Sequence, residues 1–229
     1  MLCVVKGDGM KALVVGATGE TGRRIVRVLV AKGIPVRVMV RDRQQAQEIL
    51  PNTVEFAVGD VLKRNTIEAA ITDCTVLVCA TGARPSFDPT GPYQVDYEGT
   101  KNLIDVAKAH NIEHFVMVSS LCVSRFFHPL NLFWLVLYWK QQAEDYLVKS
   151  GVPYTIVRPG GLKNDDTDDR PLIMAPADTL FEGNIPRLKV AETCVAALQD
   201  AGAKNKVVEI VAQENATQKP FSELFAGIS

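Results

Sequence analysis

The chain has 229 residues, of which 47% are hydrophobic and 22% are charged. This length and composition suit one globular α/β domain with a substantial buried core. The formal net charge is −1, so no basic field favours nucleic acid, and we expect no nucleic-acid partner. We expect the domain over residues 10–229, with residues 1–9 as a candidate disordered extension.

The opening residues, "MLCVVKGDG", are too short and too polar for a secretory signal. The five cysteines form no C-x-x-C pair and show no metal-ligand spacing. We therefore expect no bound metal, and we expect reduced thiols in a cytoplasmic protein or one of an equivalent organelle stroma.

Seven short runs rich in β-branched residues alternate with helical patterns. Strands are expected over residues 11–16, 36–40, 54–58, 75–80, 114–119, 154–158 and 206–212. Helices are expected over residues 21–33, 97–111 and 189–202, where apolar residues recur at helical spacing. Most strand runs are apolar along their length, as in parallel strands covered on both faces. The alternation predicts a Rossmann-type, doubly wound parallel sheet in a single α/β domain.

A glycine-rich turn, "VVGATGETGRRI", joins the first expected strand to the first helix. Gly16 permits the tight turn, Gly19 lets the backbone approach a pyrophosphate, and Gly22 lets helix and strand pack closely. The candidate cofactor-binding residues of this turn are Gly16, Thr18, Gly19, Glu20, Thr21 and Gly22. A turn without a ligand is the alternative reading of the motif.

The second strand ends in "VMVRDR", which puts Arg41 first after the strand. Sites for NAD usually carry an acidic residue there, whereas an arginine suits the 2′-phosphate of NADP(H). Asp42 comes one place late and is expected to point elsewhere, while Arg43 and Arg23 could assist. A solvated basic turn is the alternative, and we favour NADP(H).

Two later strand ends complete the expected cofactor site. Asp60 and Val61 follow the third strand, where a carboxylate can accept a hydrogen bond from the adenine amino group. Ala80, Thr81 and Gly82 close the fourth strand and leave no bulky side chain against the ribose–phosphate bridge.

These motifs resemble the atypical short-chain dehydrogenase/reductase family, in its NmrA-like and biliverdin-reductase-B-like branch. The matching stretches are "GATGETG", "VRD", "GDV", "VDYEGTKNL", "VSS", "AEDYLVKSGVPYTIVRPGGL" and "PFSELF". The resemblance implies the fold and the nicotinamide cofactor. It leaves the substrate open, because the branch includes flavin and biliverdin reductases, redox-sensing regulators and members that dock on other proteins.

The resemblance also implies a serine after the fifth strand and a Tyr-x-x-x-Lys pair that protonates a carbonyl. Ser119 and Ser120 follow that strand, with Ser120 the candidate catalytic serine, although another register puts Leu121 there. Lys140 matches the lysine, but the residue four positions earlier is valine. Tyr138 precedes Lys140 by two residues, about 200° around a helix, so it is not a displaced tyrosine. Lys140 keeps a role in binding the nicotinamide ribose.

Without that acid, the site suits acceptors that spread the charge of the hydride over a conjugated system. We therefore expect an NADPH-dependent reductase of a flavin, a quinone or a linear tetrapyrrole. A non-catalytic NADP(H)-sensing or scaffolding protein that docks on a partner is the alternative. After the sixth strand, the turn at Pro159, Gly160 and Gly161 is expected to expose backbone groups for the nicotinamide carboxamide; a flexible loop entry is the alternative.

A small substrate-covering part is expected over residues 122–139 and 162–186. Within it, Asp165, Asp166, Asp168 and Asp169 fit no calcium loop and suggest a solvated mobile lid. Of the histidines, His110 and His114 are expected at the surface.

The longest stretch without Asp, Glu, Lys or Arg, "FFHPLNLFWLVLYW", has 14 residues, too few for the roughly 20 that span a bilayer. Helical spacing predicts that Leu132, Leu135 or Val136, Trp139, Ala143 and Tyr146 or Leu147 pack on the sheet. The opposite side would carry Phe133, Trp134, Leu137 and Tyr138. We expect that side to contact an acceptor, a protein or a membrane surface; cover by neighbouring loops is the alternative.

Overall fold

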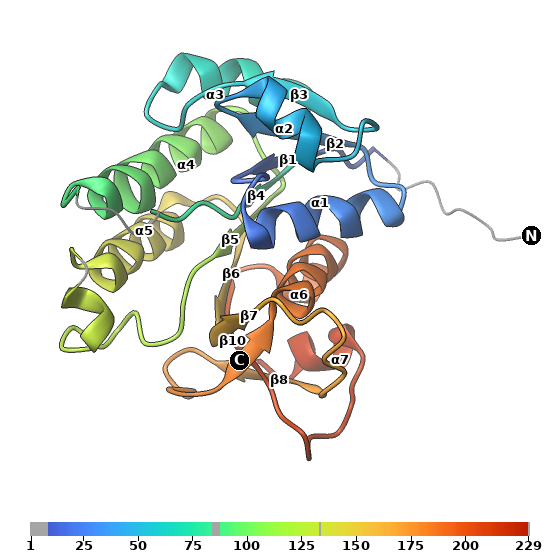
Figure 1. Ribbon diagram of the computed structural model, residues 1–229, viewed down its shortest axis with the longest axis vertical. Coiled ribbons are helices and arrows are strands. Elements are labelled where there is room, and N and C mark those ends of the chain that lie inside the picture. Colours follow the sequence, from blue (N-terminus) through green and yellow to red (C-terminus); the bar gives the residue numbers. More distant parts are fainter. Residues whose placement is uncertain (1–8, 84–87, 133, 229) are drawn as a thin grey trace, which may run out of the picture.

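The computed structural model describes residues 9–83, 88–132 and 134–228, and a single sheet organises them (Figure 1). The strands lie in the order β3-β2-β1-β4-β5-β6-β10-β9-β7, with β8 paired to β10. Their bounds are β1 Ala12–Val15, β2 Val36–Val40, β3 Glu55–Val58, β4 Val76–Cys79, β5 His114–Val118, β6 Tyr154–Pro159, β7 Gly161–Lys163, β8 Leu172–Pro176, β9 Asn184–Pro186 and β10 Lys206–Ala212.

All seven expected strands are present, and they pair in parallel from β3 through β1 to β10. The doubly wound, Rossmann-like α/β fold is therefore confirmed. The three strands that the pattern did not predict lie at the far edge, where β8 and β9 run antiparallel to β10. β7 and β9 have only three residues each, too few for a periodic pattern.

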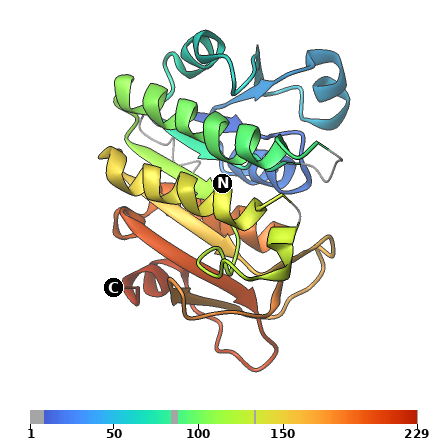
Figure 2. The same ribbon diagram turned by 90° about the vertical axis from the view of Figure 1, so that its left-hand side faces the viewer.

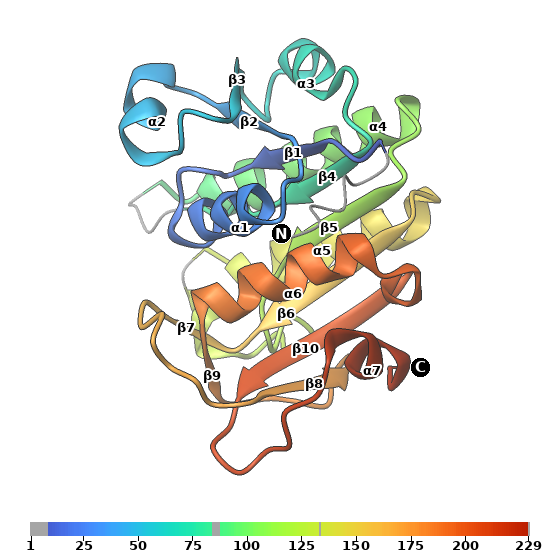
Figure 3. The ribbon, with the colours of Figure 1, turned by 90° about the vertical axis from the view of Figure 1, so that its right-hand side faces the viewer.

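Helices cover both faces of the sheet. α4 and α5 lie over one face (Figure 2), and α1 and α6 lie over the other (Figure 3). The bounds are α1 Glu20–Ala31, α2 Arg43–Ile49, α3 Arg64–Ile71, α4 Gly99–Ala109, α5 Val136–Ser150, α6 Arg187–Gln199 and α7 Phe221–Ala226, with the π-helix η1 Pro92–Glu98 and the 3-10 helices η2 Pro129–Leu132 and η3 Ala201–Ala203.

Alternation along β1 shows why its residues are all apolar. Ala12 and Val14 belong to the core beneath α1 and α6, whereas Leu13 and Val15 belong to the core beneath α3, α4 and α5. Side chains of a strand point to opposite faces in turn, so a strand covered on both faces has no polar side. Each fully buried Val or Leu contributes about 1.5–3 kcal/mol through the hydrophobic effect.

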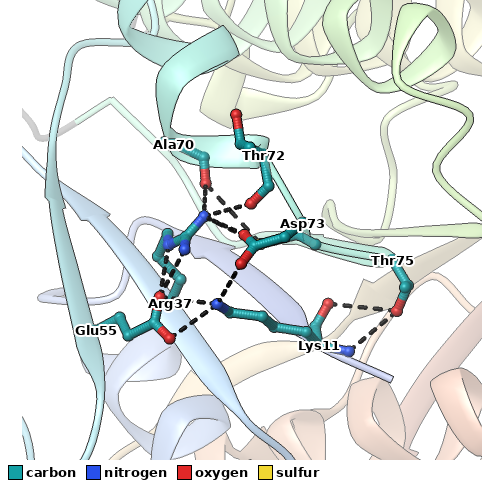
Figure 4. Close-up of polar contacts among 8 residues, drawn as sticks. Lys11, Arg37, Glu55, Ala70, Thr72, Asp73 and Thr75 are labelled. Carbon is teal, nitrogen blue, oxygen red and sulfur yellow. Dashed lines mark hydrogen bonds and ion pairs between the residues drawn. The ribbon is translucent and has the colours of Figure 1, made fainter. Parts of the chain in front are cut away.

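At the amino ends of β1, β2 and β3, a cluster of ion pairs holds the strands together (Figure 4). Lys11 contacts Glu55 and Asp73 at 2.8 and 3.0 Å, and Arg37 contacts the same carboxylates at 2.6 and 2.7 Å. Arg37 also donates to the carbonyls of Ala70 and Thr72. Both carboxylates are more than half exposed, so solvent screens the pairs, and we assign the cluster a local structural role.

The expectations for the chain ends and the membrane have different outcomes. The candidate extension over residues 1–9 falls almost entirely outside the described residues and stays a prediction. No helix within residues 9–83, 88–132 and 134–228 has the length and apolar character needed to cross a bilayer.

The expectation for His114 is wrong, because this first residue of β5 is buried. Its Nε2 lies 2.8 Å from the hydroxyl of Thr155, and that hydroxyl donates to the carbonyl of Ala203. The hydroxyl therefore accepts from the histidine, which places the imidazole proton on Nε2. Burial, the largest cause, lowers the pKa of His114 to about 4.

This burial predicts a loss of stability in mild acid. The unfolded histidine titrates near pH 6.5, so the folded protein binds fewer protons between that pH and about 4. Stability contributed by neutral His114 is complete above pH 6.5 and is lost as the pH falls through this window. His114→Gln keeps a donor for Thr155 without titrating. Urea unfolding at several pH values measures this effect. As the pH falls, the free energy of unfolding of the variant should decline less steeply than that of the unaltered protein, by at most about 1.4 kcal/mol per pH unit; parallel declines would contradict the assignment.

Candidate functional site

The glycine turn between β1 and α1 has the geometry of a phosphate cradle. Gly16 has φ +83°, and a Cβ on it would lie 2.5 Å from the carbonyl oxygen of Ala80. A Cβ on Gly22 would lie 2.1 Å from the carbonyl oxygen of Gly16. Gly19 caps α1, whose first amides have no intrahelical acceptors. The first and third glycines are thus required by close contacts, and the helix N-terminus is open to an anion.

A cleft of about 420 Å³ runs along the carboxyl ends of β1 to β4. It brings together half of the sequence-predicted residues: Gly16, Thr18, Gly19, Arg41, Asp60, Val61, Ala80, Thr81 and Gly82. The remaining candidates do not line it: Glu20, Thr21, Gly22, Ser119, Ser120, Lys140, Pro159, Gly160 and Gly161. The residues that line the cleft fit a dinucleotide: the glycine turn leaves space that a Cβ would fill, and Arg41 lies next to it.

Arg41 lies where the cleft adjoins a smaller hollow of about 350 Å³, which it lines together with Thr18 and Gln45. Asp42 also borders this hollow, but its Oδ1 accepts a hydrogen bond from the amide of Gln45 at 3.1 Å and caps α2. The carboxylate is therefore engaged with α2, although the residue itself lines the hollow that we expected it to point away from. Arg23 pairs with Glu20 at 2.5 Å, so neither side chain lines the hollow.

The third strand end is fixed by α4. A Cβ on Gly99 would lie 2.5 Å from the side chain of Val61. The side-chain amide of Asn102 donates through Nδ2 to the carbonyl of Val61 at 3.0 Å. Asp60 accepts from the amide of Leu62 through Oδ1. The "EGTKN" part of "VDYEGTKNL" thus positions the end of β3 in the cleft.

Sequence reasoning missed the wall of the cleft formed by the π-helix η1. Gly91, Gln94 and Val95 line the cleft, and Asp96 projects from the same π-helix into the protein. π-helices are rare and often mark functional sites. The signal available in the sequence was the acidic residue of "VDYEGT".

Lys140 lies beside the cleft, paired with Asp96. Its Nζ is 2.8 Å from Oδ1 of Asp96, and the two side chains are 14% and 1% exposed. The Cβ position of Gly82 lies 3.9 Å from each of these atoms. Burial, the largest single cause, would lower the pKa of Lys140, but the carboxylate of Asp96 and the smaller contributions of Cys79 and Glu144 counteract it, and the pKa is raised. Lys140 is therefore held as a cation behind the cofactor wall.

The first turn of α5 supports the absence of a tyrosine acid. Val136 opens the helix, and α5 continues unbroken through Tyr138 and Lys140. The ring of Tyr138 packs edge-on against Phe126 and Trp139, at 6.0 and 5.0 Å between centroids. Its environment is thus an aromatic cluster, while Lys140 contacts Asp96 on another face of the helix.

Behind the serines lies a buried charged network. Ser119 is buried and Ser120 is half-buried at the end of β5. One turn after Lys140, Glu144 pairs with Arg158 of β6 at 2.7 Å, and burial raises the pKa of Glu144 despite this arginine. Arg158 also contacts Glu209 of β10 at 3.3 Å.

The backbone amides of Gly160 and Gly161, in the turn expected to bind a nicotinamide carboxamide, are already paired within the protein. The amide of Gly160 donates to the carbonyl of Ile210 at 3.0 Å, and the amide of Gly161 donates to that of Gly183 at 2.9 Å. The carbonyl of Pro159 accepts from the amide of Leu121 at 3.0 Å. Pro159 ends β6 and Gly161 begins β7, so the expectation is wrong for the amides of Gly160 and Gly161, and a role for the other backbone groups of the turn stays a prediction.

The acidic segment after β7 is tethered by its carboxylates. Asp166 forms an ion pair with Arg24 of α1 at 2.7 Å, and Asp168 pairs with Arg170 at 2.6 Å. The amide oxygen of Asn164 accepts from Arg187 of α6. Asp165, Asp166 and Asp169 are exposed, so the expected solvation of this segment is confirmed, and its mobility stays a prediction. The contacts with Arg24 and Arg187 hold the segment across α1 and α6 on one face of the sheet.

The two segments expected to cover the substrate contact each other. The thiol of Cys122 lies 3.2 Å from the carbonyl of Phe181. The guanidinium of Arg125 lies 3.6 Å from the centre of the Phe181 ring. Ser124 donates to Asp178 at 2.6 Å. They form one unit at the carboxyl ends of the strands.

The predicted faces of the apolar stretch are partly wrong. Leu137 is buried, whereas Leu132 is 84% exposed; Ala143 and Leu147 are buried, as expected, and Phe133 lies outside the described residues. The stretch is no continuous helix: η2 ends at Leu132, and Leu135 has a left-handed backbone with φ +58° before α5 begins. This break shifts the helical phase. An exposed surface remains, here named the apolar rim: Phe126, Phe127, Leu130, Leu132, Trp134 and Leu135.

Comparisons with known proteins agree with this geometry. The model of the NAD(P)H-binding family matches residues 16–201. An uncharacterised chloroplast protein of Arabidopsis thaliana is 42% identical over 95% of this chain and 82% of its own length. Sanguinarine reductase of Eschscholzia californica is 32% identical over 97% of this chain and 98% of its own length.

Two further matches concern length and fold. The chloroplast protein TIC 62 of Pisum sativum is 36% identical over 96% of this chain, which spans only 46% of that protein. A putative NAD-dependent epimerase/dehydratase from Bacillus halodurans superposes with a TM-score of 0.83 at 28% identity, over 95% of this chain and 99% of its own. With its glycine cradle and cofactor cleft, this chain belongs to the NAD(P)H-binding family, among atypical short-chain dehydrogenase/reductase-like oxidoreductases.

Proposed function

We propose that this protein is an NADPH-dependent reductase of a conjugated or aromatic acceptor, such as a flavin, a quinone or a linear tetrapyrrole. One observation carries the choice of acceptor: α5 keeps Lys140, which is paired with Asp96, while Val136 stands at the position of the tyrosine acid. The sanguinarine reductase relative supports reduction of a small molecule. We place the reaction in the cytoplasm or an equivalent stroma.

The chemistry follows from where charge develops. Bound NADPH supplies a hydride. A ketone would gather the resulting negative charge on one oxygen, whose stabilisation requires a positioned acid. A conjugated acceptor spreads that charge over many atoms, and water can deliver the balancing proton. Lys140 binds and orients the ribose, and Ser120 is the candidate hydrogen-bond donor to the acceptor.

The test is to mix the pure protein with NADPH and a panel of flavins, quinones, biliverdin and simple ketones, and to follow nicotinamide absorbance. We expect oxidation of NADPH with conjugated acceptors and none with ketones. Tyr138→Phe should leave the rate nearly unchanged, because the ring packs against Phe126 and Trp139. A hundredfold lower rate in Tyr138→Phe at normal NADPH affinity would contradict the absence of a tyrosine acid.

NADP(H) is the proposed cofactor because Arg41 lines a hollow beside the cleft, together with Thr18. Arg41→Ala should weaken NADPH by the loss of a charge-assisted contact, on the order of 1.5–3 kcal/mol, and leave NADH affinity nearly unchanged. Arg43→Ala, two positions along, is the matched control because Arg43 lines neither hollow. Titrations of both cofactors measure the effect, and equal NADH and NADPH affinities in the unaltered protein would remove the assignment.

A second candidate function is a non-catalytic NADP(H)-sensing scaffold that docks on a partner protein or a membrane surface. The apolar rim favours it, since Phe127 and Leu132 are 96% and 84% exposed in a cluster larger than single scattered residues. An edge-on row of rings connects the rim to the cleft wall through Phe126, Tyr138, Trp139 and Tyr93.

Phe127→Glu combined with Leu132→Glu tests the rim, because exposed side chains can be charged without disturbing the core. We expect a folded protein with wild-type thermal stability that loses self-association, membrane retention or acceptor affinity. Thr217→Glu with Gln218→Glu is the matched control on a distant exposed loop. If NADPH oxidation is absent across the panel but the rim variant loses partner binding, the scaffold replaces the reductase. Unchanged behaviour in every assay would remove the rim from the account.

A further inference from the structure

The π-helix η1 places a carboxylate where burial requires a partner. The side chain of Asp96 is 1% exposed, and a buried charge costs several kcal/mol unless it is paired and hydrogen-bonded. An ion pair meets this need at one carboxylate oxygen and a hydrogen bond meets it at the other. Lys140 lies 2.8 Å from Oδ1, and the amide of Ala83 donates to Oδ2 at 3.2 Å.

Both partners belong to the cofactor site. Ala83 lines the cleft next to Gly82, and Lys140 lies behind the same wall, 3.9 Å from the Cβ position of Gly82. One carboxylate therefore joins the lysine of α5 to the end of β4. Loss of this carboxylate would release the ammonium and the wall together.

The surroundings of Lys140 leave Asp96 as its counter-charge. The titratable groups that face the ammonium are Asp96 from η1, Cys79 from β4 and Glu144 from α5 itself. Burial raises the pKa of the Cys79 thiol, so the thiol stays neutral. Glu144 is held by Arg158 at 2.7 Å.

We propose that Asp96 is a positioning residue that holds Lys140 as a fixed cation against the Gly82–Ala83 wall and thereby sets the affinity for NADPH. The proposal rests on the proposed function in one respect, that Lys140 binds the nicotinamide ribose. The Asp96–Lys140 pair replaces the tyrosine–lysine couple of ordinary relatives. Because the Asp96 carboxylate keeps the proton on Lys140, the ammonium acts in binding and does not relay protons.

A dependence on pH follows when the carboxylate is neutralised. Burial lowers the pKa of a lysine, and in the unaltered protein Asp96 is the largest of the groups that counteract this effect, so the pKa of Lys140 is raised. In Asp96→Asn, burial acts without its main counter-charge, so the ammonium loses its proton at a lower pH than in the unaltered protein. The charge-assisted hydrogen bond to the cofactor is then lost, and NADPH affinity falls.

The experiment is a fluorescence titration of NADPH from about pH 6.5 to about pH 9.5, the range in which a desolvated lysine titrates. Asp96→Asn is nearly isosteric, and its amide oxygen can still accept from Ala83. We expect constant affinity in the unaltered protein and at least a roughly tenfold fall in the variant as the pH rises. A variant curve that is flat, whether at full or at uniformly reduced affinity, would overturn the proposal, because a structural role alone changes no pH profile.

Lys140→Met and the double variant Asp96→Asn/Lys140→Met separate the pair from other effects. Both should bind NADPH weakly, with equal affinity and no dependence on pH. A slope that persists in the double variant would assign the titration to another group and refute the proposal.

Two outcomes remain distinct because the readout is affinity. A protein that binds NADPH but reduces nothing tests the Asp96 proposal fully, whereas failure to bind NADPH at all would refute the proposed function. If Asp96→Asn does not fold, the unaltered protein carries the test. Affinity that already falls between neutral pH and about pH 9 would mean that Asp96 does not hold the proton on Lys140.

Discussion

The buried guanidinium of Arg158 is the interaction on which the arrangement of the site depends. It joins β6 to Glu144 of α5, to Glu209 of β10 and to Asp178 of the loop after β8. Glu209 in turn accepts from the backbone amides of residues 178–180. Breaking a buried pair by removing one partner costs about 3–5 kcal/mol, so α5 and the covering loop are strongly fixed on the sheet. Glu144 lies one turn from Lys140, and the network therefore sets the position of that lysine as well.

The cofactor site and the acceptor chemistry are separable in this fold. The glycines of the β1–α1 turn leave space for a pyrophosphate because they have no Cβ, so this half of the site depends on backbone geometry alone. In the proposed function, the chemistry beyond the cofactor would depend on side chains of η1 and α5, where the structure has Val136 at the start of α5 and the Asp96–Lys140 ion pair. A site that binds a reductant but supplies no acid favours acceptors that stabilise their own charge. The same site can also retain a cofactor as a ligand, which is why turnover and affinity need separate measurements.

Much of the fold and the dinucleotide half of the site could be predicted from the sequence. The seven parallel strands were recognised because buried strands are continuously apolar, and the cleft residues were recognised because they follow strand ends. The helical phase of the apolar stretch could not be predicted, since η2 and the left-handed Leu135 interrupt it. Asn131 accepts from the amides of Leu137 and Tyr138 at 2.9 and 3.2 Å, a contact that caps α5 from outside the helix and has no periodic signature.

The sequence by itself determined the Rossmann-type sheet, the phosphate-binding turn and the absence of a tyrosine four residues before Lys140, because each depends on residue type at short, regular spacing. The tertiary structure decided which charges meet. Asp96 lies 44 positions from Lys140 in the chain, and only the packing of η1 against α5 brings their atoms to 2.8 Å. The hydrogen-bond partners of the Gly160 and Gly161 amides, the carbonyls of Ile210 and Gly183, were likewise decided by the tertiary structure. Pairing of buried polar groups is a property of three-dimensional proximity, and residue spacing along one segment does not encode it.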